Sequence, residues 1–146
     1  MGETRAMQPL ITVQGKKQST TPDVAAGNVV QPSDGWGDAK DVKDAVFHVQ
    51  ILAQEGVSGT PDRLPKLVLE TAASPAGPWK AIREWPGTAG VPINDVVGAS
   101  TRALGFDPSP SMYLLERFYR WKIDATALNV GNDTWAMCFG ICVTLK

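Results

Sequence analysis

The chain has 146 residues, of which 43% are hydrophobic and 20% are charged, and its formal net charge is −1. A chain of this length forms about one domain and can bury a sizeable core without disulfides or metals. Because there is no basic excess, general nucleic-acid binding is not expected. No apolar run approaches the ~20 residues that span a bilayer, so no membrane partner is expected either.

Residues 1–44 differ from the rest of the chain, because they are rich in Pro, Gly, Gln, Thr, Ser and Asp. Alone, such a segment buries too little apolar surface to offset the entropy lost on ordering. We therefore expect an extended N-terminal arm over 1–44, which orders against the domain's own surface or against a neighbouring subunit, followed by a β-sandwich domain over 45–146. The apolar side chains expected to make that contact are Leu10, Ile11, Val13, Val29 and Val30.

Three strands are predicted early in the 45–146 domain. Apolar residues alternate with others over 45–54, which is the period of a β-strand with one buried face. Residues 66–71 alternate again, and residues 79–85 follow after a turn rich in Ser, Pro and Gly, which predicts a hairpin. For 96–101, which follow Pro92, Asn94 and Asp95, the pattern fits either a strand or a short capped helix.

Two further strands close the domain. Residues 118–125 alternate, and large apolar residues occupy every second position over 135–145, with Ala, Cys, Gly and Thr between them. A turn signal in 128–133 predicts that these two strands are antiparallel partners, with Trp121 and Trp135 in or near the core. The whole pattern predicts an all-β fold, an antiparallel β-sandwich of jelly-roll or immunoglobulin-like type.

Few side chains suggest reaction chemistry. Cys138 and Cys142 would lie roughly 13 Å apart on one strand, too far for a disulfide, and their small neighbours suggest buried thiols in a reducing compartment. His48, the only histidine, is expected to face solvent or lie at a sheet edge, with no oriented catalytic partner. We expect no enzymatic activity, no cofactor and no metal, although scattered carboxylates could still meet in a hydrolase-like cleft.

The five tryptophans divide into two groups. Trp121 and Trp135 lie on apolar strand faces, and Trp79 follows a turn where it can lock a hairpin. Trp36 and Trp85 are expected in loops, where large rigid side chains anchor interfaces or stack on sugar rings. For Trp36 and Trp85 the favoured interpretation is that each packs as a lid on its own core or contacts another subunit. A carbohydrate-binding module is the alternative.

Three segments together resemble structural proteins of tailed bacteriophages, which include small β-sandwich head decoration or auxiliary proteins. The hairpin with a Ser-x-x-Gly-x-Trp turn spans 67–80, and the strands are 118–123 and 135–145. The resemblance covers roughly the C-terminal two-thirds of the chain and is to a scaffold, so it transfers no functional residue. It implies a virion protein assembled in the host cytoplasm.

The expected function is therefore that of a non-enzymatic virion structural protein, a capsid decoration or head–tail accessory protein. Its expected partners are other virion proteins and copies of itself, in a homo-oligomer or a large assembly. The arm is expected to lie along another subunit's sheet edge over 10–13 and 24–31, because main-chain hydrogen bonds then supply affinity with little demand on sequence. Loops around Trp36 and Trp85 are expected to add contacts.

Overall fold

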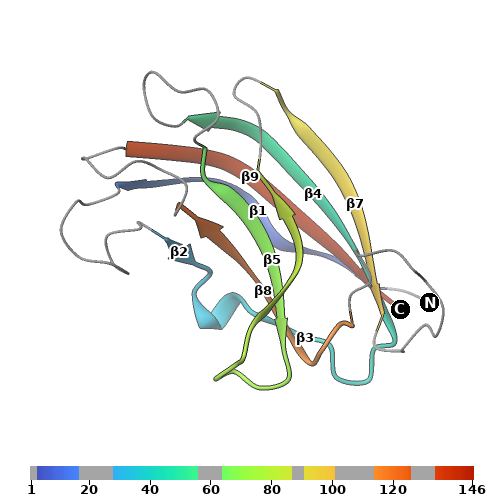
Figure 1. Ribbon diagram of the computed structural model, residues 1–146. Coiled ribbons are helices and arrows are strands. Elements are labelled where there is room, and N and C mark those ends of the chain that lie inside the picture. Colours follow the sequence, from blue (N-terminus) through green and yellow to red (C-terminus); the bar gives the residue numbers. More distant parts are fainter. Residues whose placement is uncertain (1–2, 17–27, 56–63, 87–90, 101–113, 126–133) are drawn as a thin grey trace, which may run out of the picture.

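The structure is a computed structural model, and its architecture is a sandwich of two antiparallel β-sheets (Figure 1). The all-β sandwich expected from the sequence is confirmed. Nine strands and one 3-10 turn, Ser33–Gly35, make up the regular elements among the described residues. The structure describes residues 3–16, 28–55, 64–86, 91–100, 114–125 and 134–146.

Sheet A has four strands in the order β1-β9-β4-β7. Its two inner strands alternate strictly between buried and accessible positions over most of their length, because every second residue is a large apolar one. The strands are β1 (Glu3–Lys16), β9 (Thr134–Leu145), β4 (Asp44–Glu55) and β7 (Ile93–Ser100). The segment that fitted either a strand or a helix is thus the edge strand β7.

Sheet B has the strand order β2-β8-β5-β6, and the short β3 pairs with β8 on the same edge as β2. The hairpin expected from the sequence is confirmed as β5 and β6, whose turn is closed by the Gly77 amide donating to the Ser74 carbonyl at 2.9 Å. Gly77 has a φ of 85°, a backbone region that favours glycine. The strands are β2 (Val29–Val30), β3 (Gly37–Asp38), β8 (Phe118–Asp124), β5 (Lys66–Ala72) and β6 (Lys80–Trp85).

The core lies between the two sheets and is rich in aromatic contacts. Phe47 of β4 packs edge-on against Tyr119 of β8, with ring centroids 5.3 Å apart. Trp121 of β8 meets Phe139 of β9 in the same way at 5.0 Å. Trp121 and Trp135 are buried, as the sequence indicated. These rings hold the sheets in register and contribute beyond their buried area.

Polar side chains tie the two sheets together at both open sides. At the β7 side, Asp95 accepts a hydrogen bond from Trp85 Nε1 at 2.8 Å and pairs with Arg83 of β6 at 3.1 Å. At the β1 side, Arg5 donates to the Tyr119 hydroxyl at 2.8 Å. There Trp121 Nε1 also donates to Gln8 Oε1 at 3.0 Å. The sandwich is therefore clamped on both sides, which limits relative motion of its sheets.

The predicted pairing of the last two strands is wrong. β8 lies in sheet B and β9 lies in sheet A, between β1 and β4. The two strands face each other across the core, which is why Trp121 contacts Phe139. The turn signal itself, 128–133, lies outside the described residues.

The extended N-terminal arm is not confirmed. Residues Glu3–Lys16 form the edge strand β1, which pairs antiparallel with β9 over nearly its whole length. Further along, Val29 and Val30 pair with Ile123 and Lys122 of the same chain. The physical reason is that β9 and β8 each offer an open edge, and the nearest segment able to cover it belongs to the same chain. The division at residue 44 remains a prediction.

Candidate functional site

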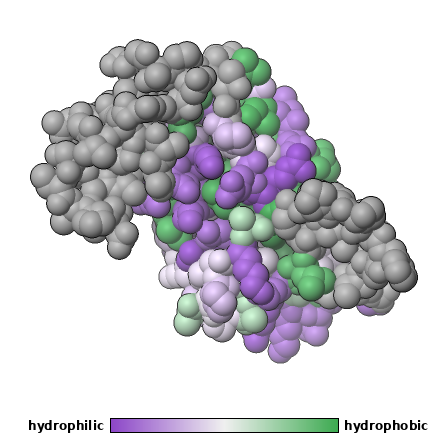
Figure 2. Space-filling view, viewed as in Figure 1, coloured by the Kyte–Doolittle hydropathy of each residue, from purple (hydrophilic) through white to green (hydrophobic). Residues whose placement is uncertain are grey.

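The two outward faces of the sandwich differ sharply in charge. On sheet B, the Glu70 side chain is only 7% exposed and pairs with Arg120 at 2.9 Å and Lys122 at 3.2 Å. Lys66 and Glu84 form a further ion pair on the same sheet at 3.7 Å. Figure 2 shows hydrophilic side chains gathered over this side of the molecule. This face has the solvated charge expected of a protein surface.

Sheet A presents the opposite character. Apart from Asp44 and Glu55 at the two ends of β4, its described outward positions, those that alternate with core residues, hold neutral side chains. Among the described outward positions of this sheet, no Lys, Arg, Asp or Glu lies between Asp44 and Glu55, the two ends of β4. We call this uncharged surface the A face. Charge is depleted in the same way in the centres of protein interfaces.

Small residues on β9 shape the A face into a groove. The described outward residues of that strand are Ala136, Cys138, Gly140, Cys142 and Thr144. β1 and β4, which flank it, carry longer side chains, so the surface dips along β9. Two adjoining hollows follow this line, with volumes of about 350 Å³ and 210 Å³. We call this depression the β9 groove.

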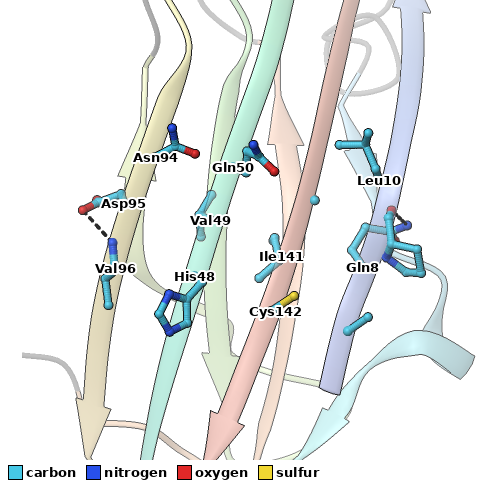
Figure 3. Close-up of a pocket in the computed structure, with 13 residues that line it drawn as sticks. Gln8, Leu10, His48, Val49, Gln50, Asn94, Asp95, Val96, Ile141 and Cys142 are labelled. Atoms are coloured by element: carbon cyan, nitrogen blue, oxygen red, sulfur yellow. Dashed lines mark hydrogen bonds between the residues drawn. The ribbon is translucent and has the colours of Figure 1, made fainter. Parts of the chain in front are cut away.

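The larger hollow is open and is lined by residues from all four strands of sheet A (Figure 3). His48 and Gln50 project from β4, beside Cys142 of β9, with which His48 is paired in register. Asn94 and Val96 of β7 bound one side. The lining is a mixture of neutral polar and apolar groups together with one acidic residue, Asp95, whose carboxylate pairs with Arg83 and accepts from Trp85 Nε1.

The opposite wall is formed by an irregularity in β1. Its pairing with β9 shifts register twice, between Ala6 and Gln8 and between Gln8 and Ile11, around Pro9. The bulged backbone near Leu10 lies close beside Gly140. A Cβ built on Gly140 would lie 3.5 Å from the Leu10 Cα. Leu10 therefore projects at the groove rim and is 57% exposed. Bulges of this kind re-aim a side chain out of the sheet.

The structure separates the predicted contact residues of the N-terminal segment. Leu10 alone among them lies at the A face, at the rim of the β9 groove. Ile11 and Val13 pair with the inward-facing Phe139 and Met137, and Val13 packs against the core. Val29 also packs against the core, whereas Val30 is exposed on sheet B. Part of the predicted 24–31 contact, 24–27, lies outside the described residues.

The two tryptophans predicted to offer loop surfaces are already occupied within the chain. Trp85 ends β6, is 4% exposed and donates to Asp95, so its predicted loop position is wrong. Trp36 is half-buried, with its ring 4.8 Å from that of Trp79. The Arg120 guanidinium lies 3.9 Å from the Trp79 centroid and 5.0 Å from that of Trp36. The buried Trp85 therefore offers no open ring face for a sugar, and the Trp36 ring already has Arg120 and Trp79 beside it.

The cysteines correct a second expectation. Cys138 is half-buried and Cys142 is exposed, and both are free thiols. The prediction of buried thiols is wrong because the small-residue side of β9 is its outward side. His48 is exposed mid-strand, which confirms that it faces solvent. The A-face residues that sequence reasoning missed, such as Gln50, Leu52, Val96 and Gly98, share one signal: alternate strand positions without charge.

No group of three or more His, Cys, Asp and Glu side chains is placed to hold a metal ion in the part of the chain that the structure describes. No helix within the described ranges has the length and apolar character needed to cross a bilayer.

Comparison with known proteins gives little similarity. No protein-family model and no curated protein matches the sequence. One similar solved structure comes from a study of Bacillus endospore appendages, described as a novel family of disulfide-linked pili. It aligns over 99% of this chain and 92% of its own chain, with a TM-score of 0.37 and 13% identity. At that TM-score the likeness carries no inference about the function of this chain.

Proposed function

We propose that this chain is a non-enzymatic structural subunit that binds neighbouring protein subunits in a larger assembly. The observation that carries the proposal is the uncharged A face, set against the charged outward face of sheet B. Free surfaces are usually kept soluble by interspersed charges, whereas buried interface centres lose them. A broad neutral sheet face is therefore suited to contact with another protein.

The rest of the fold supports a rigid binding surface. The strands of the A face are fixed by backbone pairing, and the sheet beneath it is clamped at both sides by Asp95 and Arg5. A surface that is already ordered loses little conformational entropy on binding. The mechanism proposed is thus mechanical: a preformed sheet face docks without rearrangement.

A finer proposal is that the assembly is a virion and that the chain is a head decoration or head–tail accessory protein of a tailed bacteriophage. It is supported by the resemblance carried by the hairpin at 67–80 and the strands at 118–123 and 135–145. On this proposal the protein is assembled into particles in the host cytoplasm.

The test is sedimentation of the protein from its natural source. A tagged chain is expected in fast-sedimenting fractions, far from the position of a 15.6 kDa monomer. Gln50→Lys places a charge in the middle of the A face and is expected to move the chain to slow fractions. Ala81→Lys places the same charge on an exposed position of β6 in sheet B and is the matched control.

Wild-type protein found only in slow fractions contradicts the proposed function. Fast sedimentation that Gln50→Lys and Ala81→Lys disturb equally contradicts the role of the A face. The virion proposal has its own readout, because its particles must carry nuclease-protected nucleic acid. Particles that lack nucleic acid contradict the virion proposal and leave the assembly proposal standing.

A further inference from the structure

We infer that the A face binds a second copy of this chain, face to face about a two-fold axis. The inference rests on the proposed function and narrows its partner to the chain itself. Three properties of the A face carry it: its shape, its charge and its area.

The first property is that the A face holds both a protrusion and a hollow. Leu10 and Val96 project from it, with exposed fractions of 57% and 58%. The hollow of about 350 Å³ lies between them, over Gly140 and Cys142. In a two-fold interface each contact occurs twice, so the same surface must supply both the projecting group and its receptor. The A face meets this requirement without any contribution from another protein.

The second property is neutrality. Two copies of a charged face repel each other when packed together, and like-charge contacts strongly disfavour a complex. Between Asp44 and Glu55 the described outward positions of the A face carry no charged side chain, and Asp95, which lines the hollow, is already paired with Arg83 at 3.1 Å. Two copies therefore meet with little of this penalty. The neutral amides of Gln50 and Asn94 both donate and accept hydrogen bonds. A second copy of the same face can therefore pair with them.

The third property is size. Sheet A has four strands, and its two inner strands have 12 residues each. At about 4.8 Å between strands and roughly 3.3 Å per residue, the face covers about 750 Å². A stable protein interface buries about 800 Å² per partner. One A face packed against another thus reaches the area that a specific dimer needs.

The small residues along the β9 groove favour packing between faces. Ala136, Cys138, Gly140 and Cys142 let a second sheet approach closely, so a projecting Leu10 of one copy can enter the hollow of the other. Association through the outer edge of β1 is opposed by Pro9 and the two register shifts, which interrupt a regular ladder. The face, not this edge, is the surface that fits a second copy.

The test uses the purified full chain. Sedimentation equilibrium across the micromolar range is expected to show a species of twice the 15.6 kDa monomer mass. Gln50→Lys is expected to raise the dimer dissociation constant at least about 100-fold, because each copy then buries an unpaired charge in the interface. Val96→Lys, at an exposed position of the edge strand β7, is the second variant of the A face. Ala81→Lys is the control and is expected to change the dimer dissociation constant less than about 3-fold. Circular dichroism and thermal unfolding check that each variant is folded.

A second readout locates the interface. The exposed Cys142 thiol lies in the A face, so its alkylation by N-ethylmaleimide is expected to slow as protein concentration rises through the dissociation constant. A dimer in which Cys142 reacts as fast as in the dilute chain uses another surface and overturns the inference. So does a chain that remains monomeric at all concentrations, or a dimer that both lysine variants leave intact.

The two proposals fail separately. If the purified chain is monomeric while native material still sediments in a Gln50-dependent particle, the A face binds a different protein. If the purified chain dimerises through the A face while native material stays in slow fractions, the face-to-face contact is right and the larger assembly is wrong.

Discussion

Gln31 completes the edge of sheet B, and replacing it should have a large effect on stability. β2 and β3 are only two residues long each, and between them the edge of β8 at Trp121 has no strand partner. Gln31 fills the gap. The backbone amide of Gln31 donates to the Trp121 carbonyl at 3.0 Å, and its side-chain Oε1 accepts from the Trp121 backbone amide at 3.1 Å. Its Nε2 donates to the Gly35 carbonyl at 2.9 Å.

Gln31→Met keeps the length of the side chain and removes its hydrogen bonds. The buried Trp121 amide then loses its acceptor, which costs about 1–3 kcal/mol, because a buried donor without a partner bears its full desolvation penalty. For a chain of this size that loss lowers the melting temperature by roughly 3–10 °C. Gln31→Ala adds a cavity to the same defect, so a further loss of about 1 kcal/mol is expected.

Urea unfolding followed by tryptophan fluorescence and far-UV circular dichroism gives the free energy of unfolding for each variant. Amide hydrogen exchange at Trp121 supplies a local readout, since its protection should fall in both variants. A loss below about 0.5 kcal/mol in Gln31→Met, with Trp121 still protected, would refute the argument that this side chain replaces a missing strand.

Three further predictions follow from single contacts. Gly98→Ala should raise the free energy of unfolding by about 0.5–1 kcal/mol, because Gly98 lies in a strand and no atom lies within 4 Å of a Cβ placed there. A lower urea midpoint than that of the wild type contradicts this. Glu70→Gln should lose about 1–3 kcal/mol, because Arg120 and Lys122 lose their shared, buried carboxylate, and the loss should persist in high salt in the same assay. Hydrogen bonding from the Arg117 guanidinium lowers the pKa of Asp38 below 3.8. The stability difference between wild type and Asp38→Asn should therefore be present at neutral pH and vanish as the pH falls through that lowered pKa. A difference that grows in acid contradicts this.

The strands with uninterrupted alternation could be predicted from the sequence. β4, β5, β8 and β9 alternate in sequence over most of their length, and β6 was indicated by the turn that precedes it. β1 was missed because Pro9 and two register shifts break its alternation. β2 and β3 are too short to show any period, and they are held by the edge of β8 and by Gln31.

The sheet assignment of β8 and β9 could not be read from their sequences. A turn signal between two apolar strands is equally compatible with a hairpin and with a connection that crosses between sheets. Trp121 and Trp135 are buried in either arrangement, so burial does not distinguish the two. The choice is made by long-range packing, because β1 and β4 occupy both edges of β9.

The A face was partly visible in the sequence. The sequence shows the small residues of β9, but it predicts that their side of the strand is buried, since Cys and Ala are common in cores. The missing information was that the outward positions of β4 and β7 also lack charge and lie beside those of β9. Only the three-dimensional order of the strands unites these positions into one surface.

The central place of β9 has a consequence for when the protein can fold. Thr4 of β1 and Thr144 of β9 are 140 positions apart, yet their hydroxyl oxygens lie 2.9 Å from each other. Sheet A therefore cannot close until residues 134–145 have left the ribosome, and contacts this distant in sequence make folding slow. Nascent chains cannot associate prematurely through a surface whose middle strand has not yet been synthesised.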